Sequence, residues 1–235
     1  MQPSPRLIEQ DSKSISCVGI QLEKLPQGFY VKHGKRVLDC ISSATGLLVL
    51  LPLFALVAVC IKLTSRGPVF YRQMRVGKDG HPFHIVKFRS MIGAASKMSP
   101  GITVSGDKRI TRLGIIVRRY KVDELPQLWN VLRGDMSLVG PRPELPKYVE
   151  GYSPEQKLVL CVRPGITDPA SLAYRHEEEI LSRCEDPERV YRMEILPDKL
   201  AKNLEYIRNI SFRTDLHIIF ATVSRSFLLV ESSPQ

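Results

Sequence analysis

A charge-free stretch near the N-terminus constrains the fold of this 235-residue chain more than any other feature. No charged residue occurs from Cys40 to Ile61, and the residues from Leu47 to Ile61 are all apolar, with Pro52 among them. A helix that spans a membrane needs about 20 apolar residues, and shorter runs are more often buried, re-entrant or interfacial. The strictly apolar run of 15 residues leaves three structures open: a spanning helix, a bent membrane segment and a buried core helix.

Proline and the flanking charges favour the bent segment. Pro52 lies near the middle of the stretch, where it removes a backbone hydrogen bond and kinks a helix. Positive charge marks the cytoplasmic side of a membrane segment, and both flanks are basic. The basic residues are Lys32, Lys35 and Arg36 before the stretch and Lys62, Arg66, Arg72 and Arg75 after it. We therefore predict a re-entrant membrane hairpin over residues 31–66, preceded by a loosely ordered tail over residues 1–30.

The net charge of +10 is concentrated in one part of the chain. Residues 62–122 contain 14 Lys and Arg but only two acidic residues, Asp79 and Asp107. A basic block of this size predicts an anionic partner: a nucleic acid, acidic lipid headgroups or a phosphorylated metabolite. A solvated basic face is the simpler interpretation. The five cysteines are widely spaced and show no disulfide or zinc-ligand pattern, which favours a reducing compartment.

Two adjacent carboxylates follow this block. Asp123 and Glu124 have Arg118 and Arg119 just before them and Arg142 after them. A carboxylate pair among cations suits a reaction on a phosphate group, because the cations keep an acid ionised close to an anionic substrate. Asp123 could instead serve only as a helix N-cap.

The residues after the pair have a helical pattern. Leu125, Leu128 and Leu132 recur at spacings of three and four, Pro126 suits a first helical turn, and Gly134 is a stop signal. The pair is therefore predicted at the N-terminus of a helix, where the dipole and free N–H groups favour negative charge. A further helix is predicted over residues 110–120.

A β-hairpin is predicted between the apolar stretch and these helices. Residues 68–77 and 81–90 have strand composition, and Lys78, Asp79 and Gly80 form the turn. Lys87 and Arg89 alternate on one face of the second strand, where they could bind a phosphate or remain solvated.

The C-terminal half has weaker signals. Two prolines stiffen the Gly140–Pro143 loop, which suits presentation of the Arg142 guanidinium to a phosphate. Residues 174–205 alternate acid and base and predict a surface helix. An apolar stripe follows, which predicts either an interfacial amphipathic helix or a core helix. The stripe comprises Leu216, Ile219, Phe220 and Val223.

Several motifs in order, together with the apolar stretch, resemble the bacterial sugar transferases, the monotopic polyprenol-phosphate phosphoglycosyl transferases. The resemblance covers residues 35–223. Its motifs are Lys35–Asp39, Gly67–Tyr71, Gln73, Arg75, Gly77, Lys87–Met91, Asp123–Leu128, Gly134–Pro143 and Arg163–Thr167. It implies the short, catalytic-domain-only form, at the cytoplasmic face of the bacterial inner membrane. The predicted fold is α+β and mainly helical: a compact catalytic domain over residues 67–230, with the re-entrant hairpin and interfacial amphipathic helices.

The resemblance also implies a reaction. Asp123 would attack the sugar phosphate of a UDP-sugar, release UMP and form a covalent phosphosugar intermediate, and polyprenol (undecaprenyl) phosphate would accept the phosphosugar. Glu124 would assist, with Mg²⁺ at the acidic pair. The expected substrate-binding residues are Lys87, Arg89, Arg118, Arg119, Arg142 and Arg75. This would be the first membrane step of capsule, O-antigen or exopolysaccharide synthesis.

The sequence leaves some partners undetermined. The phospholipid bilayer is expected as a partner and nucleic acid is not, while formation of a homodimer stays open. The stretch Asp168–Arg175 and the residue Asn203 differ from many members of the family, and both could affect the choice of sugar, which is also open. The alternative function is a basic membrane-surface scaffold or lipid-binding protein without catalysis.

Overall fold

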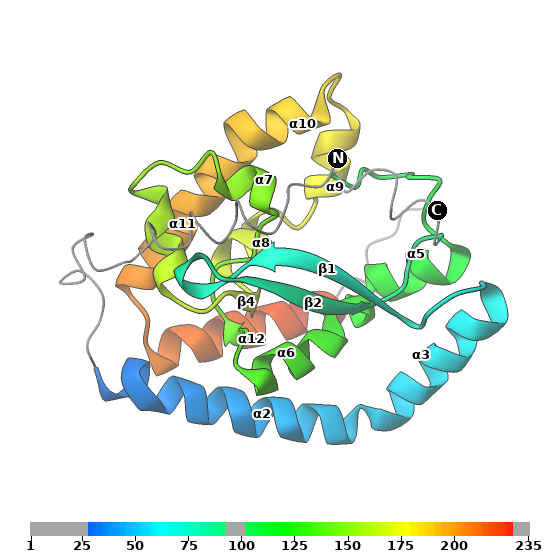
Figure 1. Cartoon of the computed structure of the whole chain (residues 1–235), viewed down its shortest axis with the longest axis horizontal. Coiled ribbons are helices and arrows are strands. Elements are labelled where there is room, and N and C mark those ends of the chain that lie inside the picture. The colour runs from blue at the N-terminus through cyan, green and yellow to red at the C-terminus, as the bar shows by residue number, and fades with distance from the viewer. Residues whose placement is uncertain (1–27, 93–101, 228–235) are drawn as a thin grey trace.

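The computed structural model describes residues 28–92 and 102–227, so the predicted N-terminal tail lies almost entirely outside the described residues. Helices dominate the described part, as predicted (Figure 1). Two helices, α2 (Lys35–Val49) and α3 (Leu51–Thr64), lie along one edge of the molecule. A π-helical turn, Tyr30–Gly34, precedes α2.

The helices α2 and α3 are separated by a break at Leu50 and differ in direction by 58°. Pro52 lies in the first turn of α3, where its missing N–H would have had no intrahelical partner in any case. The predicted bend is confirmed. Because the two helices differ in direction by only 58°, they form two helices joined at a break and not an antiparallel hairpin. Among the described residues, no single helix is both long and apolar enough to cross a membrane, and the bent pair together meets that test by length and composition.

Three polar contacts dock α2 on the rest of the protein. The Arg36 guanidinium donates to two carbonyl oxygens at the end of helix α6 (Leu128–Arg133). Asp39 accepts from the backbone N–H of Leu138 at 2.9 Å, and Lys35 forms an ion pair with Asp215 at 2.5 Å. The apolar helix pair therefore has a fixed position relative to the domain beside it.

The predicted β-hairpin is confirmed. Strands β1 (Phe70–Val76) and β2 (Pro82–Phe88) pair antiparallel, with Tyr71 opposite Lys87. Asp79 has φ of 56° in the turn, a conformation that Asp tolerates better than most residues. Ile85 is buried from β2 against Val131 of α6 and Met136, so the same face of β2 that packs on α6 also carries Lys87.

A second pair of strands was not predicted. Strands β3 (Ser137–Val139) and β4 (Gly165–Thr167) pair parallel and are three residues long, too short for a periodic pattern. The backbones cross closely beyond β3, where a Cβ on Gly165 would lie 2.1 Å from the backbone nitrogen of Gly140. Glycine at these two positions therefore allows the Gly140–Pro143 loop to start against β4.

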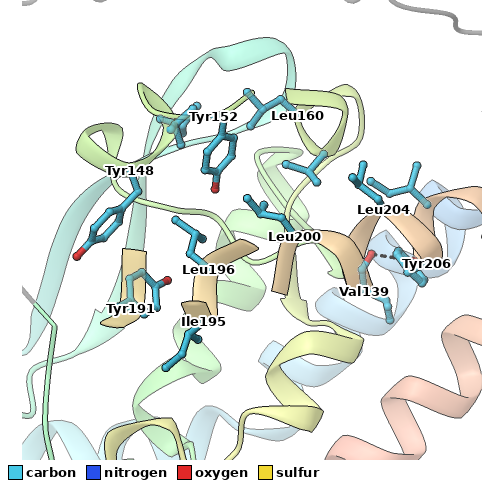
Figure 2. Packing of buried hydrophobic residues seen from close by; sticks show 14 of the residues in the cluster. Val139, Tyr148, Tyr152, Leu160, Tyr191, Ile195, Leu196, Leu200, Leu204 and Tyr206 are labelled. Atoms are coloured by element: carbon cyan, nitrogen blue, oxygen red, sulfur yellow. Dashed lines mark hydrogen bonds between the residues drawn. The ribbon is translucent and has the colours of Figure 1, made fainter. Parts of the chain in front are cut away.

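The prediction of one surface helix over residues 174–205 is wrong. The segment is divided into α9 (Glu177–Ser182), α10 (Pro187–Val190), a π-helical turn (Tyr191–Ile195) and α11 (Leu196–Arg208). Asp186 caps α10 with Pro187 at its first position, which is why the helix cannot run through. Leu196, Leu200 and Leu204 of α11 belong to the main hydrophobic core (Figure 2). The charged residues between these leucines made the segment look like a surface helix in the sequence, although the leucines form a core-facing stripe.

Helix α12 (Phe212–Phe227) decides between the two interpretations of the apolar stripe. Its core-facing side carries Asp215 and Ile218, which are 1% and 4% exposed, with Ile219 packed partly against the core. Its outer side is apolar and exposed: Phe212, Leu216, Phe220 and Val223. For these residues the core-helix interpretation is wrong, and the helix presents an apolar stripe outward. Between β2 and α12 the chain forms α5 (Arg112–Arg119) and the short helices α7 (Pro146–Val149) and α8 (Pro169–Ala173).

Candidate active site

The acidic pair lies in a short 3₁₀ helix, η5 (Val122–Gln127), that leads into α6. Lys121 enters it in the left-handed conformation, with φ of 56°. Asp123 and Glu124 occupy the first turn, as predicted, and both are buried, at 5% and 8% exposure. Lys121 holds the N-cap position and no side chain caps this helix. Asp123 is therefore not an N-cap residue, and the capping interpretation is wrong.

Glu124 is held between two cations. Its Oε1 accepts from the Lys87 Nζ and from the Arg142 Nη2, both at 2.6 Å, and Arg142 also reaches Oε2 at 3.4 Å. Burial alone would raise the pKa of Glu124, but the charges of Arg142, Lys87 and Lys121 hold it well below its usual value. Glu124 therefore stays ionised, and its Oε1 is shared by the two cations.

Asp123 has the opposite environment. Burial raises the pKa of its carboxyl group, and the charge of Glu124 beside it raises the pKa further, against the lowering effects of Lys87, Arg118 and Lys121. Among the described residues, no group hydrogen-bonds the buried Oδ1 of Asp123. Asp123 thus offers a carboxylate oxygen that is held in place but unused, as an attacking group or a metal ligand requires.

Lys87 reaches the pair because β2 is aligned on α6. The buried Asn130 accepts from the Val86 N–H at 3.0 Å and donates to the His84 carbonyl oxygen at 2.8 Å. Sequence reasoning missed Asn130, since a single polar residue inside an apolar helical pattern gives no sign of its partner. Burial lowers the pKa of Lys87, and the charge of Glu124 opposes that effect.

Arg142 reaches the pair from the Gly140–Pro143 loop. The first two residues of the loop are fixed by backbone bonds to β4, from Gly140 N–H to the Thr167 oxygen and from Gly165 N–H to the Pro141 oxygen, both at 3.0 Å. Because Arg142 donates two bonds to Glu124, its guanidinium is oriented as well as charged. These contacts agree with the prediction that a rigid loop holds Arg142.

Arg118 and Arg119, at the end of α5, both border an open cleft that also contains the acidic pair. Arg118 forms an ion pair with Glu178 of α9, on the other side of that cleft. Its charge still lowers the pKa of Asp123, so it acts on the pair from nearby. An incoming phosphate could replace Glu178, because an ion pair this exposed contributes little stability.

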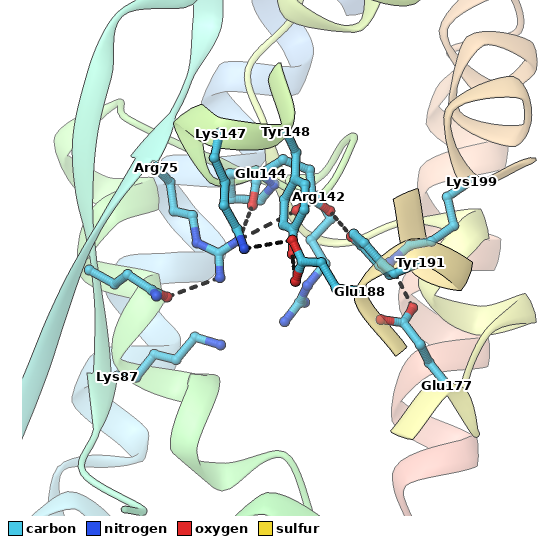
Figure 3. A network of polar contacts seen from close by, with 12 residues as sticks. Arg75, Lys87, Arg142, Glu144, Lys147, Tyr148, Glu177, Glu188, Tyr191 and Lys199 are labelled. Carbon is cyan, nitrogen blue, oxygen red and sulfur yellow. Dashed lines mark hydrogen bonds and ion pairs between the residues drawn. The ribbon is translucent and has the colours of Figure 1, made fainter. Parts of the chain in front are cut away.

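Two predicted phosphate ligands have other partners. Arg89 is 7% exposed, and its guanidinium donates to the Ser65 and Arg66 carbonyl oxygens and to the Ser65 hydroxyl, at the C-terminal end of α3. It follows the last residue of β2, and the structure brings it to the end of α3 and not to Glu124. Arg75 donates to the Pro143 oxygen at 3.1 Å and faces Glu144 (Figure 3). Its contacts support the Arg142 loop.

The residues at the pair can be compared with the needs of Mg²⁺. Within the described ranges, no three His, Cys, Asp or Glu side chains are grouped to hold a metal. Mg²⁺ in phosphate-transfer sites is usually held by one or two carboxylates together with water and substrate phosphates. The free Oδ1 of Asp123 fits such a role, with Glu124 beside it, provided that the substrate supplies further oxygens.

Comparison with known proteins settles the family. A family model described as bacterial sugar transferase matches residues 30–228. The chain belongs to this family. The match spans the helix pair α2–α3, the acidic pair and α12, so the membrane-type segment and the candidate site belong to one family unit.

Individual bacterial proteins match the chain at moderate identity. The UDP-N-acetylgalactosamine-undecaprenyl-phosphate N-acetylgalactosaminephosphotransferase of Aeromonas hydrophila is 36% identical over 80% of this chain and 42% of its own length. The UDP-glucose:undecaprenyl-phosphate glucose-1-phosphate transferase of Caulobacter vibrioides is 39% identical over 80% of this chain and 68% of its own length. The exopolysaccharide production protein PSS of Rhizobium leguminosarum is 40% identical, over 80% and 92%. The chain thus spans about two fifths of the Aeromonas relative.

Proposed function

We propose that this protein transfers a sugar 1-phosphate from a UDP-sugar to undecaprenyl phosphate and releases UMP. The observation that carries the proposal is the difference in hydrogen bonding between the two carboxylates of the acidic pair. Glu124 is paired with Lys87 and Arg142, while the adjacent Asp123 has a buried oxygen that accepts no hydrogen bond from any residue the structure describes. The family supports the same general reaction, because two relatives are named as undecaprenyl-phosphate sugar phosphotransferases.

The chemistry follows in two steps. An oxygen of the Asp123 carboxylate attacks the phosphorus that bears the sugar, the bond from that phosphorus to the bridging oxygen breaks, and UMP leaves with the bridging oxygen. An oxygen of undecaprenyl phosphate then attacks the same phosphorus, and the bond to Asp123 breaks. The product is undecaprenyl-diphospho-sugar, and the Asp123 carboxylate is restored.

The charges around the pair suit this reaction. Arg142 and Lys87 offset the negative charge that would otherwise oppose the approach of a diphosphate to two carboxylates, and preorganised cations of this kind lower the barrier. Arg118, on exchange of Glu178 for phosphate, adds a third cation. Mg²⁺, if bound by Asp123 with Glu124 and the diphosphate, would supply further neutralisation of the phosphate oxygens.

Placement at a membrane supports the lipid acceptor. The α2–α3 pair exposes Leu48, Leu51, Leu56 and Leu63, and α12 exposes its own apolar stripe. Large exposed apolar surfaces of this kind mark contact with a membrane or a partner. We propose a monotopic arrangement at the cytoplasmic face of the inner membrane, with the bent pair inserted in the bilayer and α12 at its surface. The lipid phosphate would then lie at the level of the acidic pair.

The test is UMP release by the detergent-solubilised protein with undecaprenyl phosphate, Mg²⁺ and a panel of UDP-sugars. Asp123→Asn should abolish release, and Asp79→Asn, in an exposed turn that Asn tolerates equally well, should not. UMP from one donor, with intact Asp123 only, would establish the reaction and the sugar. Full activity of Asp123→Asn would exclude the proposed nucleophile. Absence of release with every donor, with vesicle binding retained, would favour a membrane-surface scaffold.

A further inference from the structure

The Gly140–Pro143 loop, which carries Arg142, is supported by a buried charge pair that is separate from the acidic pair. Glu144 follows the loop and is 7% exposed. Its carboxylate lies 3.5 Å from the Arg75 guanidinium, and it accepts from the Tyr191 hydroxyl at 2.7 Å. Its backbone oxygen accepts from the Val76 N–H at 3.0 Å, which joins the loop to β1.

These contacts lead to Arg142 through a stiff connection. Arg75 donates to the carbonyl oxygen of Pro143, the residue between Arg142 and Glu144, at 3.1 Å. It also donates to Gln73 on its own strand at 2.9 Å, which fixes the guanidinium. Pro143 has a fixed φ and restricts the backbone of the residue before it. A shift of Glu144 is therefore transmitted to Arg142 and not absorbed by the loop.

Tyr191 fixes the other side of Glu144. It is 4% exposed, and its ring packs against the Tyr148 ring, with centroids 5.1 Å apart. Lys199, which is itself buried and paired with Glu177, lies 5.3 Å from the centroid of the Tyr191 ring. Figure 3 shows the ion pair of Lys199 with Glu177 and the contacts of Glu144 with Tyr191 and Arg75.

We propose that Glu144, held by Arg75 and Tyr191, is a positioning residue that directs the Arg142 guanidinium at the phosphate undergoing transfer. The inference rests on the proposed function and assigns Glu144, Arg75 and Tyr191 a role that acts through Arg142. It gives Arg75 a role different from the substrate binding that the sequence predicted. It also explains why the carboxylate of Glu144 is buried next to a cationic site, where it would otherwise compete with substrate phosphate.

The matched test compares two tyrosines of the same cluster. Tyr191→Phe removes the hydroxyl that donates to Glu144, and Tyr148→Phe removes a hydroxyl that donates to Glu188 instead, at 3.0 Å. We expect Tyr191→Phe to lower kcat about tenfold, to leave the donor KM within about twofold, and to leave Tm close to that of Tyr148→Phe. Tyr148→Phe should retain wild-type kinetics.

A second arm separates positioning from general loosening of the fold. Arg142→Lys keeps the positive charge but replaces the oriented guanidinium by a flexible ammonium. If Tyr191 acts through Arg142, the effect of Tyr191→Phe should shrink to less than about twofold in the Arg142→Lys background, because interacting residues are not additive. Equal proportional effects in both backgrounds, or equal effects of the two tyrosine variants, would overturn the inference.

The two proposals fail in different ways. A wild-type protein without transferase activity contradicts the proposed function before any variant is compared. An active wild type in which Tyr191→Phe behaves like Tyr148→Phe contradicts only the positioning role. If Tyr191→Phe does not fold, Glu144→Gln replaces it in the same comparison, since it removes the charge next to Arg75 and preserves the shape of the side chain.

Discussion

At the scale of single residues, the two carboxylates of the acidic pair differ in what burial does to them. Glu124 has two cationic partners and a pKa held well below its usual value, whereas burial and Glu124 raise the pKa of Asp123. The raised pKa means that the folded state binds the proton of Asp123 more tightly than the unfolded chain does. The contribution of Asp123 to stability is therefore full below about pH 4 and is lost as the pH rises through its raised pKa.

This asymmetry predicts opposite effects of two substitutions that both abolish transfer. Asp123→Asn should raise Tm at pH 7.5 by about 2–4 °C, the shift that ~1 kcal/mol gives in a chain of this size. Glu124→Gln should lower Tm by on the order of 10 °C, because Lys87 and Arg142 lose a buried partner. Thermal unfolding in detergent measures both.

The pH dependence provides the control. The stabilisation by Asp123→Asn should disappear as the pH falls towards 4, where wild-type Asp123 is protonated in the folded protein. A Tm gain that is independent of pH, or a loss of stability at pH 7.5, would contradict the raised pKa. As the pH is lowered, the activity of the wild type should begin to fall at a higher pH than it would with an aspartate of ordinary pKa. The reason is that the attacking form of Asp123 is the ionised carboxylate.

Sequence reasoning identified the residues that carry charge at the site but not all of their partners. Asp123, Glu124, Lys87 and Arg142 come together as predicted, since adjacent residues, strand alternation and a stiff loop restrict where side chains can point. Arg89 shares a face with Lys87 in an ideal strand, but β2 ends at Phe88. Its guanidinium binds the end of α3, a long-range contact that strand periodicity cannot predict.

At the scale of elements, short local signals were reliable and long mixed patterns were not. The β-hairpin and α5 follow from turn residues and helical spacing, which are local. The region 174–205 is interrupted between α9 and α10 because Asp186 and Pro187 start a new helix. The buried ion pair of Lys199 with Glu177 then allows a charged residue to face inward, against the simple rule that charge means surface.

The outer stripe of α12 gives the element-scale prediction. Phe220 is 72% exposed, and contact of this stripe with a bilayer would place it among lipid chains. The protein has a single tryptophan, Trp129, so Trp129→Phe combined with Phe220→Trp gives a single reporter on α12. We expect its fluorescence in vesicles to be quenched by lipids brominated on the acyl chains.

The control places the reporter elsewhere on the surface. Ile180 of α9 is also exposed, at 44%, and α9 lies on a different part of the molecule from α12 (Figure 1). Trp129→Phe with Ile180→Trp should show no quenching by the same lipids. Equal quenching at both positions, or none at position 220, would mean that α12 does not lie at the bilayer surface.

At the scale of the whole molecule, the α2–α3 helix pair and the candidate active site belong to one packed body. Asp215 of α12 is 1% exposed and accepts three bonds: from the hydroxyls of Tyr30 and Tyr206, each at 2.6 Å, and from Lys35 at 2.5 Å. Lys35 begins α2, Tyr206 lies in α11, and Asp215 therefore joins three parts of the chain. No sequence pattern links these positions, because they are far apart and each is a single polar residue.

Removal of this junction should loosen the helix pair from the site. Asp215→Asn leaves the Lys35 ammonium without its buried partner, and loss of one member of a buried ion pair costs about 3–5 kcal/mol. We expect Tm to fall by on the order of 10 °C. In the protein that remains folded, the KM for undecaprenyl phosphate should rise more than the KM for the UDP-sugar, because in the proposed arrangement the helix pair holds the site at the level of the lipid phosphate.

A matched aspartate and a double variant make the test specific to the junction. Asp198→Asn removes a carboxylate that is 45% exposed and also accepts from a tyrosine hydroxyl, that of Tyr174, so it should shift Tm little. Lys35→Met combined with Asp215→Asn removes the unpaired charge and should recover part of the lost stability, but not the acceptor KM, since the connection between α2 and α12 is still missing. Recovery of both quantities would show that Asp215 only neutralises Lys35. An unchanged acceptor KM in Asp215→Asn would show that the helix pair keeps its position through Arg36 and Asp39 alone.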